Sequence, residues 1–157
     1  MKITLKSSNS LSPDLRARLA KAKAPKAALE AIGLAVISLT QRAFTQASLR
    51  PQAWAPLKAA TLKAKKRAGY GSKPLISTGA LAHSPRITAV TSKTVSVGSD
   101  RRAGSHSLAA IHQLGGKDGS IPARPFFPFD KAGKPTPRAS KNITSAARRA
   151  LDLERKP

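Results

Sequence analysis

PKAALEAIGLAVISLTQRAFTQASL, residues 25–49, carries the pattern on which the fold depends. Its apolar side chains recur at spacings of three and four: Leu29, Ile32, Val36, Leu39 and Ala43. That period places them on one face of a helix and gives a single buried stripe. Proline is favoured in the first turn of a helix, so Pro25 is the expected start. The stretch therefore predicts a long helix from Pro25 to about Leu49, ended by the Arg50-Pro51 pair.

Two short runs predict a β-hairpin. Residues 86–91 (RITAVT) and 94–98 (TVSVG) are rich in β-branched side chains, alternate in polarity and are separated by Ser92-Lys93. Residues 2–6 (KITLK) alternate in the same way and predict one more strand. Together these elements predict an α+β fold, in which one long helix packs on a small antiparallel sheet.

The remaining segments predict shorter elements. We expect short helices over 13–21, about 61–66, one or two turns within 77–81, and 107–114; Ser12 is the predicted N-cap of the first. A linker rich in Gly, Pro and Lys precedes a last helix, for which Ser140 or Asn142 is the expected cap. The predicted organisation is a single α+β domain over residues 1–130, followed by a basic linker and C-terminal helix over 131–157.

The charge of the chain is strongly unbalanced. It has 29 Lys and Arg against 7 Asp and Glu, a formal net charge of +22, and no acid lies between Glu30 and Asp100. Such like charge opposes a compact monomer unless a polyanion or an acidic surface neutralises it. A solvated basic surface without a partner is the alternative. The cations that we predict to contact DNA or an acidic partner are Lys63, Lys65, Lys66, Arg67, Arg101, Arg102, Arg148 and Arg149.

Residues able to perform chemistry are few and unpatterned. The chain lacks cysteine, which excludes disulfides and thiolate zinc sites, and its three histidines have no ligand spacing. Neither Ser77 nor Ser107 lies in a G-x-S-x-G context. We therefore predict no catalytic residue, no metal and no cofactor. No apolar run is long enough for a signal peptide or a membrane span.

One segment is unusually specific: Ile111-His112-Gln113-Leu114-Gly115-Gly116, followed by Ile121-Pro122-Ala123-Arg124-Pro125-Phe126-Phe127. Proline fixes φ and restricts the residue before it, so this is a stiff loop carrying bulky apolar groups. Such a loop is typical of an anchor between molecules. The predicted oligomer or partner interface comprises Trp54, His112, Gln113, Arg124, Pro125, Phe126 and Phe127.

Several of these residues also have an intramolecular interpretation. Arg124 suits a bidentate bond to a carboxylate across a subunit interface, or to phosphate, but its stem could instead pack on Phe126. His112 is more simply explained if its ring nitrogens tie the helix end to the following loop. Trp54 is most simply a half-buried anchor.

Five motifs in one order resemble those of the phage virion morphogenesis, or tail completion, family of tailed bacteriophages. They are Trp54-Ala55-Pro56-Leu57 with Thr61 and Lys65, Leu75-Ile76-Ser77-Thr78-Gly79-Ala80-Leu81, Val95-Ser96-Val97-Gly98-Ser99, Ile111 to Gly116, and Pro122 to Phe126. The resemblance spans residues 44–130. Where family members often have an aromatic-Ala pair before the Ile-His-Gln run, this chain has Leu108-Ala109-Ala110, and its segment between Ser99 and Ser107 is unusually basic.

The resemblance implies a non-enzymatic structural protein of the head–tail connector, the neck or the tail end. It implies a homo-oligomeric ring, expected to be a hexamer, assembled in the host cytoplasm and placed in the virion around or near the DNA channel. Its expected partners are other phage neck and tail proteins and, non-specifically, genomic DNA, with no membrane. We expect the hairpin 86–98 and the loop 121–129 to join subunits, with Phe126 and Phe127 in a neighbour's apolar pocket and Arg124 paired to an acid.

The alternative is a free, non-specific DNA-binding protein of the nucleoid type. It explains the charge and leaves the Pro-rich aromatic loop unexplained. No helix-turn-helix or other nucleic-acid motif supports it.

Overall fold

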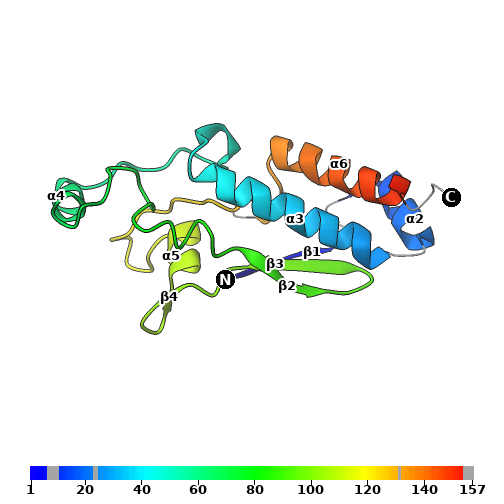
Figure 1. Ribbon diagram of the computed structural model, residues 1–157, viewed down its shortest axis with the longest axis horizontal. Helices are drawn as coiled ribbons and strands as arrows, with labels where there is room; N and C mark the ends of the chain where they lie inside the picture. Colours follow the sequence, from blue (N-terminus) through cyan, green and yellow to red (C-terminus); the bar gives the residue numbers. More distant parts are fainter. Residues whose placement is uncertain (7–10, 23–24, 131, 154–157) are drawn as a thin grey trace.

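The computed structural model describes residues 1–6, 11–22, 25–130 and 132–153, and its fold is α+β, as predicted (Figure 1). Strands β1 (Lys2–Lys6), β2 (Arg86–Val90) and β3 (Thr94–Gly98) form an antiparallel sheet in the order β1-β3-β2. A second, two-stranded ribbon joins β4 (Arg102–Ala103) to β5 (His106–Ser107). The strand over 2–6 and the hairpin are therefore confirmed.

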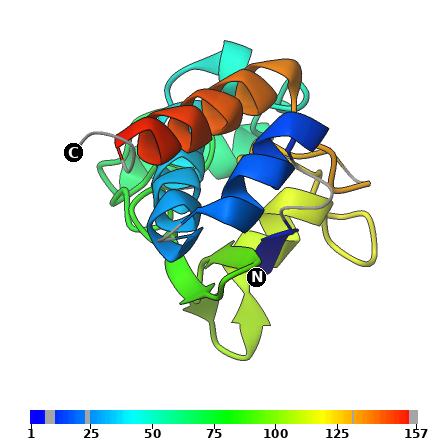
Figure 2. The ribbon, with the colours of Figure 1, turned by 90° about the vertical axis from the view of Figure 1, so that its right-hand side faces the viewer.

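Helix α3 (Pro25–Ala43) is the centre of the molecule. The sheet lies on one side of it, and α6 (Pro137–Leu153) lies on the other, next to α2 (Pro13–Lys21) (Figures 1 and 2). The close approach to the sheet depends on Gly33, because a Cβ there would lie 2.9 Å from side-chain carbons of Ile87 and Val95. The layers are thus sheet, α3 and the pair α2 and α6.

The core is continuous from one end of the chain to the other. Buried side chains of α3, such as Leu29, Ile32 and Val36, belong to the same cluster as Ile143 and Leu151 of α6. The C-terminal helix therefore shares its core with the residues before 130. Of the predicted segment 131–157, Lys131 and residues 154–157 lie outside the described part of the chain.

The long helix is shorter than predicted. It ends at Ala43 rather than Leu49, because the N–H groups of Phe44 and Thr45 bond three residues back, at 3.3 and 3.1 Å, which tightens and ends the helix. Arg50 caps this end, since its guanidinium donates to the carbonyls of Ala43 (2.7 Å) and Phe44 (3.2 Å). A separate 3₁₀ turn, η1, spans Ala47–Leu49.

The last helix starts earlier than predicted, so the fold has two long helices of 19 and 17 residues rather than one. Pro137 takes the first position of α6, and the Thr136 hydroxyl accepts from the Ala139 N–H at 3.3 Å. Ser140 and Asn142 therefore lie inside the helix and do not cap it.

The shorter elements follow the predictions with one exception. Ser12 caps α2 and Ser107 caps α5 (Leu108–Leu114), while α4 (Ala59–Arg67) starts slightly before the expected residue. The stretch 77–81 forms turns and no helix, because Gly79 has a φ of +78°, in the left-handed region. No helix among the described residues is both long and apolar enough to cross a bilayer.

Residues 57–74 project from this body, and we call them the arm. The arm carries α4 at its far end, at the left of Figure 1, and none of the side chains of α4 is buried. A segment that contributes nothing to the core is free to contact another molecule.

Candidate functional site

The residues of the predicted interface converge at the root of the arm. Trp54 precedes the arm, His112 and Gln113 end α5, and Arg124 to Phe127 form the stiff loop. We call these seven residues, Trp54, His112, Gln113, Arg124, Pro125, Phe126 and Phe127, the motif cluster. The contacts that they make within the chain are as follows.

Gln113 fixes the path of the loop. Its side-chain oxygen accepts from the N–H groups of Phe126 and Phe127, both at 3.0 Å, and its amide nitrogen donates to the carbonyls of Phe127 (3.4 Å) and Phe129 (3.5 Å). Only 7% of Gln113 is exposed. A single buried carboxamide therefore bonds backbone groups of a loop that belongs to neither sheet.

Phe126 and Phe127 fill the core of their own chain. Both are 0% exposed, the two ring centres lie 5.0 Å apart, and Phe126 lies 5.1 Å from the ring of Phe44. The expectation that these rings enter a neighbour's pocket is corrected by this arrangement, because neither ring has surface left to offer. Proline-rich loops with paired aromatics can close a core as readily as they can bridge two molecules.

Arg124 holds the root of the arm. Its guanidinium donates to the carbonyls of Ala55 (2.8 Å) and Pro56 (2.9 Å), so two backbone oxygens take the place of the expected carboxylate. The residue is 6% exposed, and burial lowers the pKa of its guanidinium. The expected acid does not describe these contacts, since the bonds run to the segment that enters the arm.

Trp54 is the half-buried anchor that the sequence predicted. Its indole N–H donates to the carbonyl of Pro125 at 2.8 Å, and Phe44 meets the ring edge-on at 5.7 Å between centres. The guanidinium of Arg50 lies 3.7 Å from the ring centre, a cation–π distance. The sequence places Arg50 at the end of the predicted helix but does not predict this contact or the cap, because the side chain reaches back past η1 to the carbonyls of Ala43 and Phe44.

His112 joins the loop through its backbone and not its ring. The Arg124 N–H donates to the His112 carbonyl at 2.7 Å, whereas the Nδ1 atom is buried and has no hydrogen-bond partner in the described part of the chain. Burial, and next the positive charge of Arg124, lowers the pKa of the imidazole. The prediction that the ring nitrogens tie helix to loop is therefore wrong.

The sequence model of the phage virion morphogenesis family matches residues 8–156. The chain belongs to this family. The match covers more of the chain than the motifs between residues 44 and 130, and it includes α2, α3 and α6. No curated protein and no solved structure shows significant similarity to the chain.

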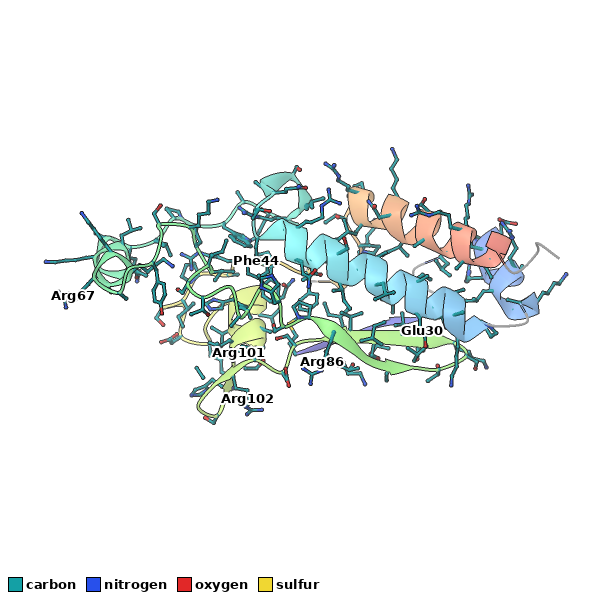
Figure 3. All side chains as sticks on the ribbon, in the orientation of Figure 1. Glu30, Phe44, Arg67, Arg86, Arg101 and Arg102 are labelled. Atoms are coloured by element: carbon teal, nitrogen blue, oxygen red, sulfur yellow. The ribbon has the colours of Figure 1, made fainter. Side chains whose placement is uncertain are left out.

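In this phage virion morphogenesis protein the predicted cations fall into separate regions. Lys63, Lys66 and Arg67 are exposed on α4, and Arg67 points outward at the end of the molecule in Figure 3. Arg101 and Arg102 lie far from it, at the β4–β5 ribbon. A third pair, Arg148 and Arg149, is exposed on α6. The structure does not gather the eight predicted cations on one face.

Lys65 differs from its neighbours on α4. Its ammonium donates to the carbonyl of Ile76 and, at 3.2 Å, to the hydroxyl of Ser77, and it lies 5.8 Å from the ring centre of Tyr70. Lys65 therefore ties α4 to the segment that directly follows the arm. Its charge is directed inward, and we remove it from the candidate contacts.

A groove of about 500 Å³ lies beside the motif cluster. Its apolar lining includes Met1, Ile3, Leu114, Ala123, Pro125 and Phe129. Leu114, at the end of α5, is 62% exposed. This groove, unlike the buried phenylalanines, leaves apolar surface open beside the stiff loop.

The described residues hold no group of three His, Cys, Asp or Glu able to bind a metal ion. The ion pair of the sheet, Arg86 with Asp100 at 2.6 Å, is exposed and lies at the base of the β-hairpin. It raises the pKa of the guanidinium and lowers that of the carboxyl. An exposed pair of this kind contributes little to stability.

Proposed function

We propose that this protein is a non-enzymatic structural component of the head–tail connector or tail end, assembled as a ring, expected to be hexameric, around or near the DNA channel. The observation that carries the proposal is the family match over residues 8–156. The open apolar groove and the net charge of +22 support it, since one suits a subunit contact and the other a position beside DNA. Neighbouring subunits and other neck and tail proteins are its partners.

The subunit contact combines the groove with the free edge of the sheet. Among the described strands β2 pairs with β3 alone, so its outer edge leaves N–H and C=O groups unpaired there. A bulge between Ile87 and Ala89 limits this edge to short pairings. The hairpin 86–98 therefore remains a proposed contact, while Leu114 and its groove replace Phe126 and Phe127 as the apolar contact.

The native mass of the purified chain, measured by light scattering at low and high salt, tests the ring. A ring-sized species that survives high salt is expected, because apolar contacts resist screening. A monomer at both salt concentrations would favour the free DNA-binding protein.

A pair of matched variants tests the interface. Leu114→Asp is expected to lower the native mass, whereas Leu34→Asp on α3 should leave it unchanged, although Leu34 is exposed to the same degree, 61% against 62%. The opposite result, with dissociation only in Leu34→Asp, would move the contact to α3 and reject the groove.

A further inference from the structure

We infer that the arm binds the phosphate backbone of duplex DNA through Lys63, Lys66 and Arg67. The inference rests on the proposed function, which places the ring next to DNA, and it assigns that contact to one element. The arm is the part of the described chain where three exposed cations fall within five residues, with no acid between them.

The three cations share one side of α4. Their spacings of three and four residues bring them onto neighbouring turns of the same helix face. Lys65, on another side, is held by Ile76 and Ser77. Lys65 therefore fixes α4 to the segment after the arm, whereas the other three cations are exposed to solvent.

This cluster destabilises the free arm. Like charges three and four residues apart on a helix repel one another and lower its stability. Helix α4 has nine residues, no buried side chain and no acid in its first turn, so little else offsets that repulsion. A bound polyanion neutralises this repulsion, so binding would stabilise α4 relative to the free arm.

The composition of the arm favours DNA over an acidic protein. Protein interfaces centre on large apolar or aromatic anchors, whereas interfaces with DNA are polar and strongly positive. Most residues on α4 other than the cations are small, and its one large apolar side chain, Leu62, is 39% exposed. The aromatic side chain of the arm, Tyr70, lies after α4, with its ring centre 5.8 Å from the ammonium of Lys65. The arm also contains no Asn or Gln, the side chains that read adenine, so we infer contacts to phosphate without sequence preference.

The test is the salt dependence of binding between the full chain and a labelled duplex of random sequence, followed by fluorescence anisotropy. The variant Lys63→Gln/Lys66→Gln/Arg67→Gln should lower the slope of log K against log salt by about 2 to 3, since each phosphate contact contributes about 0.9. Because no side chain of α4 is buried, the variant is expected to keep its fold, which circular dichroism checks.

The matched control removes the same charge elsewhere. Lys26→Gln/Lys93→Gln/Lys141→Gln changes three exposed lysines outside the arm, at the start of α3, the turn of the β-hairpin and α6. It should change the slope by less than about one. Equal slopes for the two triple variants would overturn the inference. It would also be overturned if the arm variant bound DNA fully but lost its native mass, because the arm would then contact a neighbouring protein.

The native mass keeps this test separate from that of the ring. If the wild-type chain is a monomer but the arm variant still loses its slope, the proposed ring fails and the arm contact stands. If the ring forms and both triple variants bind DNA alike, the ring stands and the arm contact fails.

Discussion

The side-chain oxygen of Gln113 lies 3.0 Å from the backbone nitrogen of Phe126 and accepts its hydrogen bond. The same oxygen accepts from Phe127, so one residue at the end of α5 organises the loop that closes the core. Hydrogen bonds to buried backbone groups contribute most through the penalty for leaving those groups unpaired. The motif that identifies the family is therefore, in its contacts within this chain, a device for positioning a loop.

Replacing Gln113 with Leu is expected to destabilise the protein by about 1–3 kcal/mol for the group or groups left unpaired. Leucine has nearly the same size but cannot accept from Phe126 and Phe127. Urea unfolding, followed by the fluorescence of the single tryptophan, measures the change. Gln46→Leu makes the same replacement at an exposed position outside the groove and should stay within about 0.5 kcal/mol of the wild type. Equal effects of the two variants would mean that the Gln113 hydrogen bonds contribute nothing.

Replacing Arg124 with Met is expected to loosen the root of the arm. It leaves the carbonyls of Ala55 and Pro56 without their donors, at a cost of about 1–3 kcal/mol. Trp54 is the only tryptophan and bonds the adjacent Pro125, so its emission should shift to the red in the folded variant. Arg124→Lys should recover only part of the loss, because an ammonium lacks the planar fork that serves two carbonyls. Full recovery by lysine would contradict the bidentate role.

The close packing of α3 on the sheet makes Gly33 sensitive to a single methyl group. Alanine gains up to about 1 kcal/mol of helix propensity over glycine, but a Cβ would lie 2.9 Å from carbons of Ile87 and Val95. Overpacking typically costs about 1–3 kcal/mol, so we expect Gly33→Ala to lower the melting temperature. Adding Ile87→Val removes one of the clashing carbons and should restore part of the loss. A melting temperature above that of wild type in Gly33→Ala would contradict the prediction, because it would mean that Ile87 and Val95 move aside at little cost.

The sequence predicted the elements whose pattern is local. The apolar period of α3, the β-branched alternation of the hairpin and the Ser12 cap all depend on residues close in the chain, and the structure contains each of them. The helix ends were less predictable. The end of α3 at Ala43 is capped by Arg50, which lies seven residues further along the chain. The start of α6 is set by Thr136, which competes as a cap with Ser140 and Asn142.

The candidate site was found by residue but not by role. The motif pointed to Trp54, Gln113 and Arg124, and the structure brings them together; yet their partners are backbone carbonyls and N–H groups, which no side-chain pattern reveals. The basic run on the arm showed the opposite behaviour. Its role as a charged contact surface was predicted from the sequence, but only the structure shows that Lys65 bonds within the chain whereas Lys63 is exposed.

The buried imidazole of His112 predicts that stability depends on pH. Its pKa is lowered in the folded chain, so between the folded value and the ordinary value of about 6.5 the unfolded chain binds more protons. The free energy of unfolding is then constant above that range and falls as the pH drops below about 6.5. Urea unfolding over a pH series measures this, and His112→Gln should flatten the profile there.

The other two histidines provide the control for this prediction. His83 and His106 are exposed, so His106→Gln should leave the wild-type profile unchanged. Nuclear magnetic resonance should find an imidazole that titrates below the ordinary range in the wild type, and its signal should be absent from His112→Gln. Because Arg124 contributes to the shift, Arg124→Met is expected to raise the pKa of His112 toward its ordinary value. An unaltered value in that variant would assign the shift to burial alone.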